Sequence, residues 1–126
     1  MEDKEITSII IGSAIKIHKK IGPGVLENVY KECLFHELKK AGLKVQKEVT
    51  LPINYDDLHL EYGYRIDILV EDRIILELKT VEYLNDKHLA QILTYLRLSE
   101  NKLGLLINFN EPLIKNGIKR VVNHYC

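Results

Sequence analysis

The sequence predicts an α/β domain in which helices flank a mixed central β-sheet. Two observations predict this class. Apolar residues recur every three or four positions in the first third of the chain and again after residue 85, as in amphipathic helices. Between these regions, and again after residue 101, the apolar residues follow the patterns of strands. A strand, helix and strand in succession after a β-meander imply a sheet with parallel and antiparallel neighbours.

The first helix is predicted to end at Gly22-Pro23-Gly24, a strong turn signal. A second helix follows, and Gly42 is its expected C-terminal stop. Each helix has one apolar face. The first comprises Ile6, Ile9, Ile10, Ala14, Ile17 and Ile21, and the second comprises Leu26, Tyr30, Cys33, Leu34, Leu38 and Ala41.

Three strands are predicted next, over residues 45–55, 58–70 and 74–81. Pro52 places the first at a sheet edge, because proline cannot donate to a ladder. The third is almost wholly apolar, which indicates a central strand. In the second strand, alternation predicts one shared face, made of Leu58, Leu60, Tyr62, Tyr64, Ile66, Ile68 and Val70.

The last part of the chain contains a further helix and two short strands. Asn85 or Asp86 is expected to cap a helix that runs to about Ser99, with an apolar stripe through Leu89, Ile92, Leu93 and Leu96. Residues 102–108 read as a buried strand. Glu111-Pro112 opens a loop or short helix, and residues 118–123 read as a last strand.

The composition excludes several classes of protein. The chain has 126 residues, 46% of them hydrophobic and 29% charged, and 18 Lys and Arg balance 18 Asp and Glu. Zero net charge argues against an all-over basic DNA-coating protein and a polybasic membrane binder. No run reaches the roughly 18 apolar residues of a membrane span. Without linkers or repeats, residues 1–126 are expected to form a single domain.

The balanced charge is unevenly distributed. Residues 1–47 carry nine basic and six acidic side chains (+3), residues 48–86 carry three and ten (−7), and residues 87–126 carry six and two (+4). The acidic middle is either chance clustering on solvated strands and turns or a carboxylate site that needs a cation.

The two cysteines, Cys33 and Cys126, have neither metal-ligand spacing nor a disulfide framework. Cys33 lies in an apolar helical stripe and is expected in the core. The N-terminus is too acidic for a signal peptide. We therefore expect a cytoplasmic protein.

The most informative stretch surrounds Asp67, Glu77 and Lys79, on adjacent strands of one hairpin. A three-residue loop over 71–73 pairs Asp67 with Glu77 and sets Arg65 opposite Lys79. A two-residue loop would turn Glu77 to the other face. The three-residue loop is predicted, because Asp72 tolerates the left-handed conformation that such loops often need.

Two carboxylates directly opposite each other repel unless a positive charge compensates them. A divalent cation would provide that charge, and carboxylate oxygens suit Mg²⁺ or Mn²⁺ as ligands. An adjacent lysine can then position or activate a water, or stabilise a developing negative charge. The competing interpretation of Asp67, Glu77 and Lys79 is a solvated cross-strand charge cluster.

Three side chains on helices could join this site. Glu27 begins the second helix, and Gly22-Pro23-Gly24 determines where that helix starts. The carboxylate of Glu27 could instead serve only the helix dipole. Gln91 and Tyr95 are four residues apart beside the apolar stripe of the third helix, and could equally be a packed helix flank.

The order of these elements resembles that of a known superfamily. A Glu in a helix, an Asp on a strand, Glu-x-Lys on the next strand and Gln-x-x-x-Tyr on a helix resemble the PD-(D/E)xK nucleases, which have an αβββαβ core. The stretch from Gly24 through Glu27 to Tyr30 looks like the signature of the smaller GxxExxY family within it. The resemblance extends from about Ile17 to Val122, although Ile66 stands where the superfamily usually has proline.

This resemblance implies metal-dependent hydrolysis of phosphodiester bonds in nucleic acid, usually DNA, with Mg²⁺ or Mn²⁺. The implied metal ligands are Asp67, Glu77, the Leu78 carbonyl and Glu27, the last directly or through water. It further implies that Lys79 orients or activates the attacking water and that Gln91 orients the site. Substrate contacts are expected from Tyr95, Tyr30 and Arg65, and Tyr95 could instead support Gln91.

The second hypothesis is a non-catalytic module on the same fold that binds nucleic acid or another protein. Small size favours it, because the chain has no room for a separate DNA-reading domain. A homodimer could supply the missing surface. Neither hypothesis involves a membrane.

Overall fold

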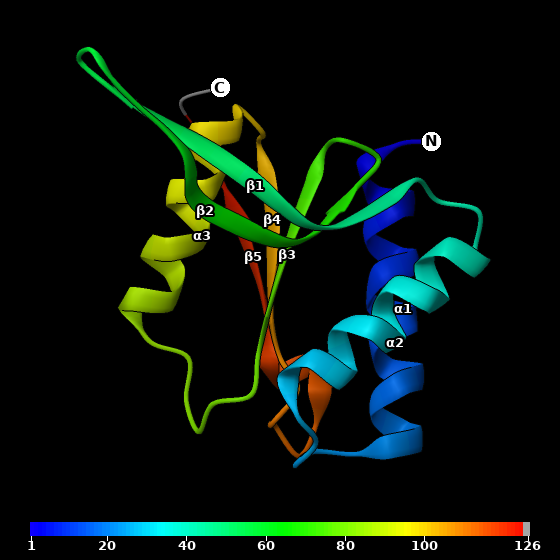
Figure 1. Ribbon diagram of the computed structural model, residues 1–126. Coiled ribbons are helices and arrows are strands. Elements are labelled where there is room, and N and C mark those ends of the chain that lie inside the picture. Colours follow the sequence, from blue (N-terminus) through cyan, green and yellow to red (C-terminus); the bar gives the residue numbers. More distant parts are fainter. Residues whose placement is uncertain (125–126) are drawn as a thin grey trace.

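A five-stranded mixed sheet forms the centre of the protein, with helices on both faces (Figure 1). The computed structural model describes residues 1–124. The strand order is β1-β2-β3-β4-β5, and only β3 and β4 run parallel. This confirms the predicted fold class. The elements are α1 (Asp3–Ile21), α2 (Glu27–Lys40), β1 (Val45–Tyr55), β2 (Leu58–Val70), β3 (Ile74–Lys79), α3 (Asp86–Ser99), β4 (Leu103–Asn108), the 3-10 helix η1 (Ile114–Gly117) and β5 (Ile118–Val122).

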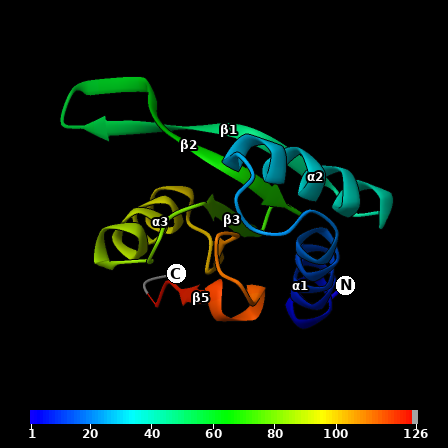
Figure 2. The same cartoon turned by 90° about the horizontal axis from the view of Figure 1, so that it is seen from below.

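The core is divided into two clusters by the sheet. Helices α1 and α2 pack on one face and α3 packs on the other (Figure 2). The central strands β3 and β4 contribute side chains alternately to both clusters, which explains their continuous apolar sequences. Pro52 lies on the edge strand β1, as predicted.

Strand β2 does not keep one apolar face, so that prediction is wrong. Ile66 packs in the α3 cluster, whereas Ile68 and Val70 pack in the α1–α2 cluster. The change of face coincides with an irregularity in β1, where Glu48 has a φ of 55° and is missing from the regular pairing. The pairing keeps its register across this point, from Lys47 opposite Ile68 to Val49 opposite Ile66. Asp67 lies at this point of β2.

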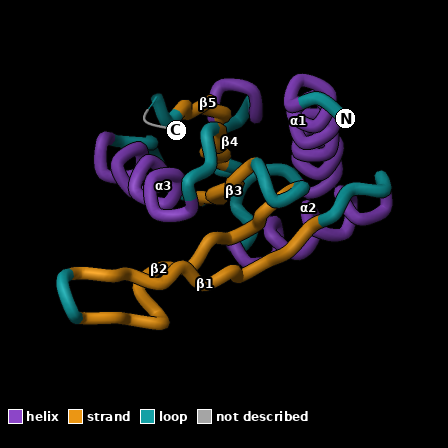
Figure 3. The backbone as a smooth tube through the Cα atoms, turned by 90° about the horizontal axis from the view of Figure 1, so that it is seen from above, coloured by secondary structure: helices purple, strands orange, loops and turns teal. Residues whose placement is uncertain are grey.

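The far half of the β1–β2 hairpin leaves the body of the protein (Figures 1 and 3). The pairing shifts register between Leu51 and Ile53, and beyond this shift the side chains of Tyr55 and Tyr62 are 70% and 86% exposed. We call residues 52–63 the arm. Alternation in the second strand predicted one shared apolar face here, but the arm extends past the helices that could have covered it.

A few helix-face predictions also differ from the structure. Leu26 is 76% exposed, because it is the N-cap of α2 and lies outside the helix. Cys33 is only partly buried. In α3, Leu89 is exposed and Tyr95 is buried in its place.

Cys126 lies outside the described residues. Among residues 1–124, no helix combines the length and apolar character that membrane crossing requires.

Candidate active site

Two hydrogen bonds from backbone N–H groups to carboxyl oxygens connect β2 and β3 at Asp67 and Glu77. The backbone N–H of Asp67 donates to Glu77 Oε1 at 3.0 Å, and the N–H of Leu78 donates to Asp67 Oδ2 at 2.8 Å. The predicted three-residue loop sets this register: Val70 pairs with Ile74, and Asp72 has a φ of 54°. The two carboxyl groups therefore lie side by side.

The regular ladder between β2 and β3 ends just before this pair. Its last partners are Ile68 and Leu76, so the expected pairing of Arg65 with Lys79 is not part of the ladder. The N–H and C=O of one strand residue point toward the same neighbouring strand. The carbonyl of Leu78 therefore points toward β2, beside Asp67.

Lys79 is held by a chain of polar side chains from α3. Its Nζ donates to Gln91 Oε1 at 2.8 Å, and Gln91 Nε2 donates to the hydroxyl of Tyr95 at 3.0 Å. The ring of Tyr95 in turn contacts that of Tyr64 on β2, with centroids 5.4 Å apart. Tyr95 is 4% exposed, so it supports Gln91 and does not offer a surface to substrate.

The loop before α2 aims Glu27 at the same place. Gly22 and Gly24 have positive φ values of 66° and 92°, which glycine adopts without strain. The hydroxyl of Tyr30 donates to the carbonyl of Gly22 and accepts a hydrogen bond from the N–H of Val25. These contacts fix the loop at Gly22 and at Val25, which lies two residues before the first residue of α2, Glu27.

Tyr30 is fully buried and its ring stacks on Phe109, with centroids 4.3 Å apart and planes 13° apart. The expectation that Tyr30 contacts substrate is therefore not supported. It acts on the site by fixing the loop before Glu27.

Glu27 reaches the end of β3 from the α2 side. Burial and the negative charge of Asp67 raise the pKa of Glu27, while the positive charge of Lys79 acts in the opposite direction. The backbone of Thr80 is also near enough to the carboxylate to lower the pKa of Glu27 slightly. Asp67 and Lys79 are thus close enough to Glu27 to act on it electrostatically.

Glu77 is the most deeply buried of the three carboxyl groups, with 2% of the residue exposed. Burial, followed by the charge of Asp67, raises the pKa of Glu77 to about 9. A hydrogen bond with the Asp67 side chain also raises it. Such a carboxyl group holds a proton at neutral pH unless a cation replaces that proton.

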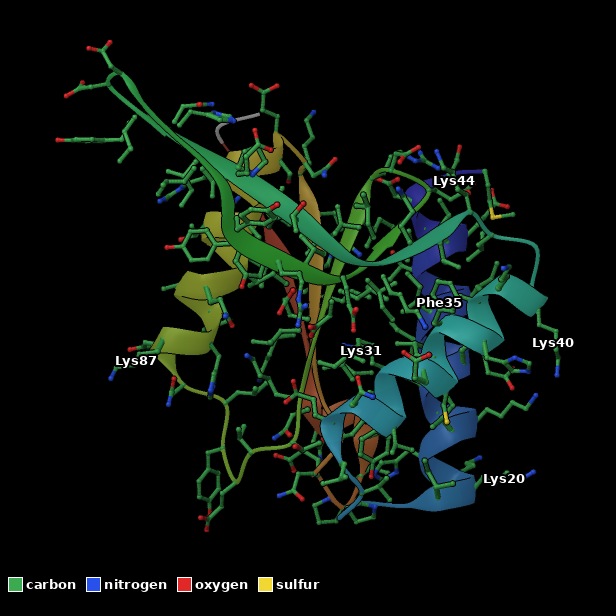
Figure 4. All side chains as sticks on the ribbon, viewed as in Figure 1. Lys20, Lys31, Phe35, Lys40, Lys44 and Lys87 are labelled. Atoms are coloured by element: carbon green, nitrogen blue, oxygen red, sulfur yellow. The ribbon has the colours of Figure 1, made fainter. Side chains whose placement is uncertain are left out.

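Sequence reasoning missed Lys31 as a neighbour of the site. It lies one turn after Glu27 on α2 and is only 9% exposed, and it points toward the sheet, whereas Lys20 and Lys40 point outward (Figure 4). Its Nζ is 2.9 Å from Glu48 Oε1, and Arg65 also influences Glu48. The i, i+4 spacing to Glu27 could have revealed Lys31.

Sequence reasoning also missed Asn108 at the end of β4. Its fully buried side chain donates to the Val81 carbonyl at 2.8 Å and accepts from the Val81 N–H at 3.1 Å. The adjacent Phe109 N–H donates to the Lys79 carbonyl at 2.9 Å. Together these bonds fix the backbone on which Lys79 and Thr80 lie. A polar residue ending an apolar strand was the available signal.

The donor set fits a divalent cation of the Mg²⁺ type. Two adjacent carboxyl groups, a nearby third carboxylate and one inward-facing carbonyl provide only oxygen ligands. The negative charge of Asp67 raises the pKa of both Glu27 and Glu77, which indicates excess negative charge that a cation would relieve. In residues 1–124, no group of three or more acidic, histidine or cysteine side chains converges into a ready-made ion cage. Binding would therefore require the side chains to adjust.

Comparisons with known proteins agree with this architecture. The profile of the PD-(D/E)XK nuclease superfamily matches residues 4–121. The crystal structure of SSO0001 superposes with a TM-score of 0.50 at 17% sequence identity, which supports a likeness of fold alone. The match covers 94% of this chain and 65% of that one, so this chain spans less than two thirds of its length. No curated protein sequence gives a significant match.

Proposed function

Because this chain belongs to the PD-(D/E)XK nuclease superfamily, we propose that it is a divalent-metal-dependent nuclease that hydrolyses phosphodiester bonds in DNA. The observation that carries the proposal is the placement of Lys79 beside the bonded pair Asp67 and Glu77. Asp67 and Glu77 offer carboxyl oxygens to a metal ion, and the ammonium group of Lys79 lies two residues after Glu77. These groups match the requirements of metal-assisted hydrolysis.

In this proposal the carboxyl groups of Asp67 and Glu77 hold Mg²⁺ or Mn²⁺, together with the Leu78 carbonyl and, directly or through water, Glu27. When bound, the cation supplies Lewis-acid stabilisation of the charge that develops on the phosphate. The Lys79 ammonium orients the attacking water and adds a fixed positive charge at the reacting centre.

The residues around Lys79 position it. Gln91 presents its amide oxygen to the ammonium, which limits the directions in which Lys79 can point. Tyr95 holds the other end of the Gln91 amide, so the amide cannot rotate without breaking a hydrogen bond. Catalytic groups held in this way need little reorganisation during the reaction.

Substrate contacts in the proposal come from the margin of the site. Arg65 is exposed there, and Lys31 lies beside Glu27 and Glu48. An Arg or Lys side chain next to a cation that carboxylates hold can bind a phosphate oxygen of the nucleic-acid backbone. Glu48, which is 41% exposed, is the internal partner that such a phosphate would replace at Lys31.

We also propose that the chain is a member of the GxxExxY group and acts in the cytoplasm. The first part is supported by Gly24, Glu27 and Tyr30, which act together: a left-handed glycine, the site carboxylate and the tyrosine that fixes their loop. The second part is supported by the lack of a disulfide framework in the sequence.

The decisive experiment is a cleavage assay on labelled single-stranded, double-stranded and branched DNA, and on RNA, with Mg²⁺, Mn²⁺ or EDTA. We expect metal-dependent cleavage that is lost in Asp67→Asn and Lys79→Met. Lys4→Met, which changes an exposed lysine at the start of α1, is the matched control and retains activity. Cleavage that persists in both site variants would refute the mechanism. Binding without cleavage of any substrate would point to a non-catalytic module instead.

A further inference from the structure

The arm has one apolar and one polar face near its tip. Cross-strand pairing places Ile53 opposite Leu60 and Tyr55 opposite Leu58. Members of such pairs lie on the same face of a hairpin, so these four side chains form one apolar surface. The intervening pair, Asn54 and His59, lies on the other face, where the two side chains are hydrogen-bonded.

No other part of residues 1–124 covers this apolar surface. Tyr55, Leu58 and Leu60 are 70%, 53% and 44% exposed, and the arm extends away from the body in Figures 1 to 3. A long hairpin with exposed apolar side chains marks an interaction site, because water disfavours such a surface.

The charge of the arm argues against nucleic acid as its partner. Residues 48–64 contain four carboxylates, of which Asp56, Asp57 and Glu61 lie on the arm, and no Lys or Arg. Nucleic-acid surfaces use cations to neutralise phosphates, and an acidic hairpin would be repelled. Its partner should be a protein surface that combines apolar side chains with positive charge.

The chain itself carries such a surface, at the C-terminal end of α1. A groove of about 360 Å³ there is lined by apolar residues, including Ile15, Pro23 and Leu113, and by Lys19 and Lys115. None of its lining residues is acidic. Neither lysine has an ion-pair partner within the described part of the chain. We call it the α1–η1 groove.

A second, larger groove between α1 and α2 fits the arm less well. Its volume is about 490 Å³, but Glu32 and Glu37 line it together with its lysines. Glu37 pairs with Lys16 and Lys40. Two of the three lysines of this groove are thus already paired, and its carboxylates would repel the arm.

We propose that the protein is a homodimer in which the arm of each copy docks in the α1–η1 groove of the other. Tyr55 and Leu58 would enter the apolar part of the groove, while Asp57 and Glu61 would face Lys19 and Lys115. The arm and the groove lie at opposite ends of the molecule (Figure 1). Two copies related by a two-fold axis in antiparallel orientation can therefore form both contacts at once.

The unequal charge distribution has a physical role in this arrangement. Asp56, Asp57 and Glu61 belong to the −7 middle segment, whereas Lys19 and Lys115 belong to the +3 and +4 outer segments, so the arm and the groove of the neutral chain are complementary in charge. Charge complementarity of this kind steers association and selects the partner.

The experiment is a charge exchange followed by sedimentation or light scattering over about 1 to 100 µM protein. We expect the native chain to be dimeric. The arm variant Asp57→Lys/Glu61→Lys and the groove variant Lys19→Glu/Lys115→Glu should each be monomeric, because each places like charges at both contacts. Mixing the two variants should restore a heterodimer, since both contacts then join opposite charges. The control Glu5→Lys/Glu82→Lys has the same charge change as the arm variant and should remain dimeric.

Several outcomes would overturn the proposal. A native chain that stays monomeric at every concentration rules out the dimer. A groove variant that remains dimeric, while the arm variant dissociates, shows that the arm docks elsewhere. Dimers that form when either variant is incubated alone would also contradict the proposal, because only the mixture joins opposite charges at both contacts. If the arm variant changes DNA binding but not mass, the arm serves nucleic acid. Circular dichroism of each variant separates dissociation from unfolding.

Discussion

The ammonium of Lys79 donates to the amide oxygen of Gln91 at 2.8 Å, and this contact links β3 to α3 at the centre of the site. The opposite end of the same amide is held by Tyr95. The side chain of Gln91 therefore holds the proposed catalytic lysine in a fixed position relative to α3.

Gln91→Leu should lower kcat about 10- to 100-fold with little change in KM, because a misplaced catalytic group loses its alignment but substrate binding is retained. Tyr95→Phe should have a smaller effect, since the contact between Lys79 and Gln91 survives. Steady-state cleavage kinetics test both. Gln46→Leu, an exposed glutamine on β1, is the control. An unchanged kcat in Gln91→Leu would exclude its positioning role.

The stability of the metal-free protein should fall as pH rises from about 6 to 9. The pKa of Glu77 in the folded state is raised to about 9, so the folded protein binds a proton that the unfolded chain has released. Its contribution to stability is complete below the ordinary pKa of a glutamate and is lost as pH passes through the raised one. Urea unfolding in EDTA at several pH values measures this effect.

The same series in Glu77→Gln should show a weaker loss of stability with pH, since the titrating group is gone. Glu82→Gln, at an exposed position, should behave like the native chain. Added Mg²⁺ should stabilise the native chain more at pH 9 than at pH 6, because the cation competes with the proton on Glu77. Equal stabilisation at both pH values would contradict the assignment of Glu77 as a ligand.

Tyr30→Phe should destabilise the protein by about 1 kcal/mol, because the Gly22 carbonyl and the Val25 N–H lose a common partner. Cleavage should also decrease, since the released loop no longer fixes Glu27. Thermal unfolding and kinetics measure the two effects. Tyr83→Phe, which alters a 74% exposed tyrosine, should change neither. Full activity in Tyr30→Phe would show that the loop is held by other contacts.

Asn108→Ala should destabilise the protein by about 1–3 kcal/mol, because the part-buried N–H of Val81 loses its partner and the Val81 carbonyl keeps only the hydrogen bond from the Asn110 side chain at 3.3 Å. It should also lower kcat, since the backbone after Lys79 becomes looser. Denaturant unfolding and single-turnover cleavage provide the readouts. The exposed Asn116→Ala is the matched control. A loss of stability without any change in the rate would limit Asn108 to a structural role.

The sequence was sufficient for features determined by neighbouring residues. Helix and strand order followed from apolar spacing, because each element must bury one stripe or face. The relative positions of Asp67 and Glu77 followed from the length of one loop, because side chains alternate along a strand and a loop of three residues permits only one register. Asp72 adopts the expected left-handed conformation in this loop, and Glu71 before it does so too.

Tertiary structure alone decided features that depend on distant segments. Burial of Tyr30 required Phe109 from the other end of the chain, and the environment of Lys31 required Glu48 on the edge strand. The change of face at Asp67 lies opposite Glu48, a position of β1 outside the regular pairing, which no pattern within β2 could reveal. The arm has the alternation of a buried strand, yet its apolar face is exposed because the helices end before reaching it. Sequence periodicity specifies which face is apolar, whereas the packing of the whole chain decides what, if anything, covers that face.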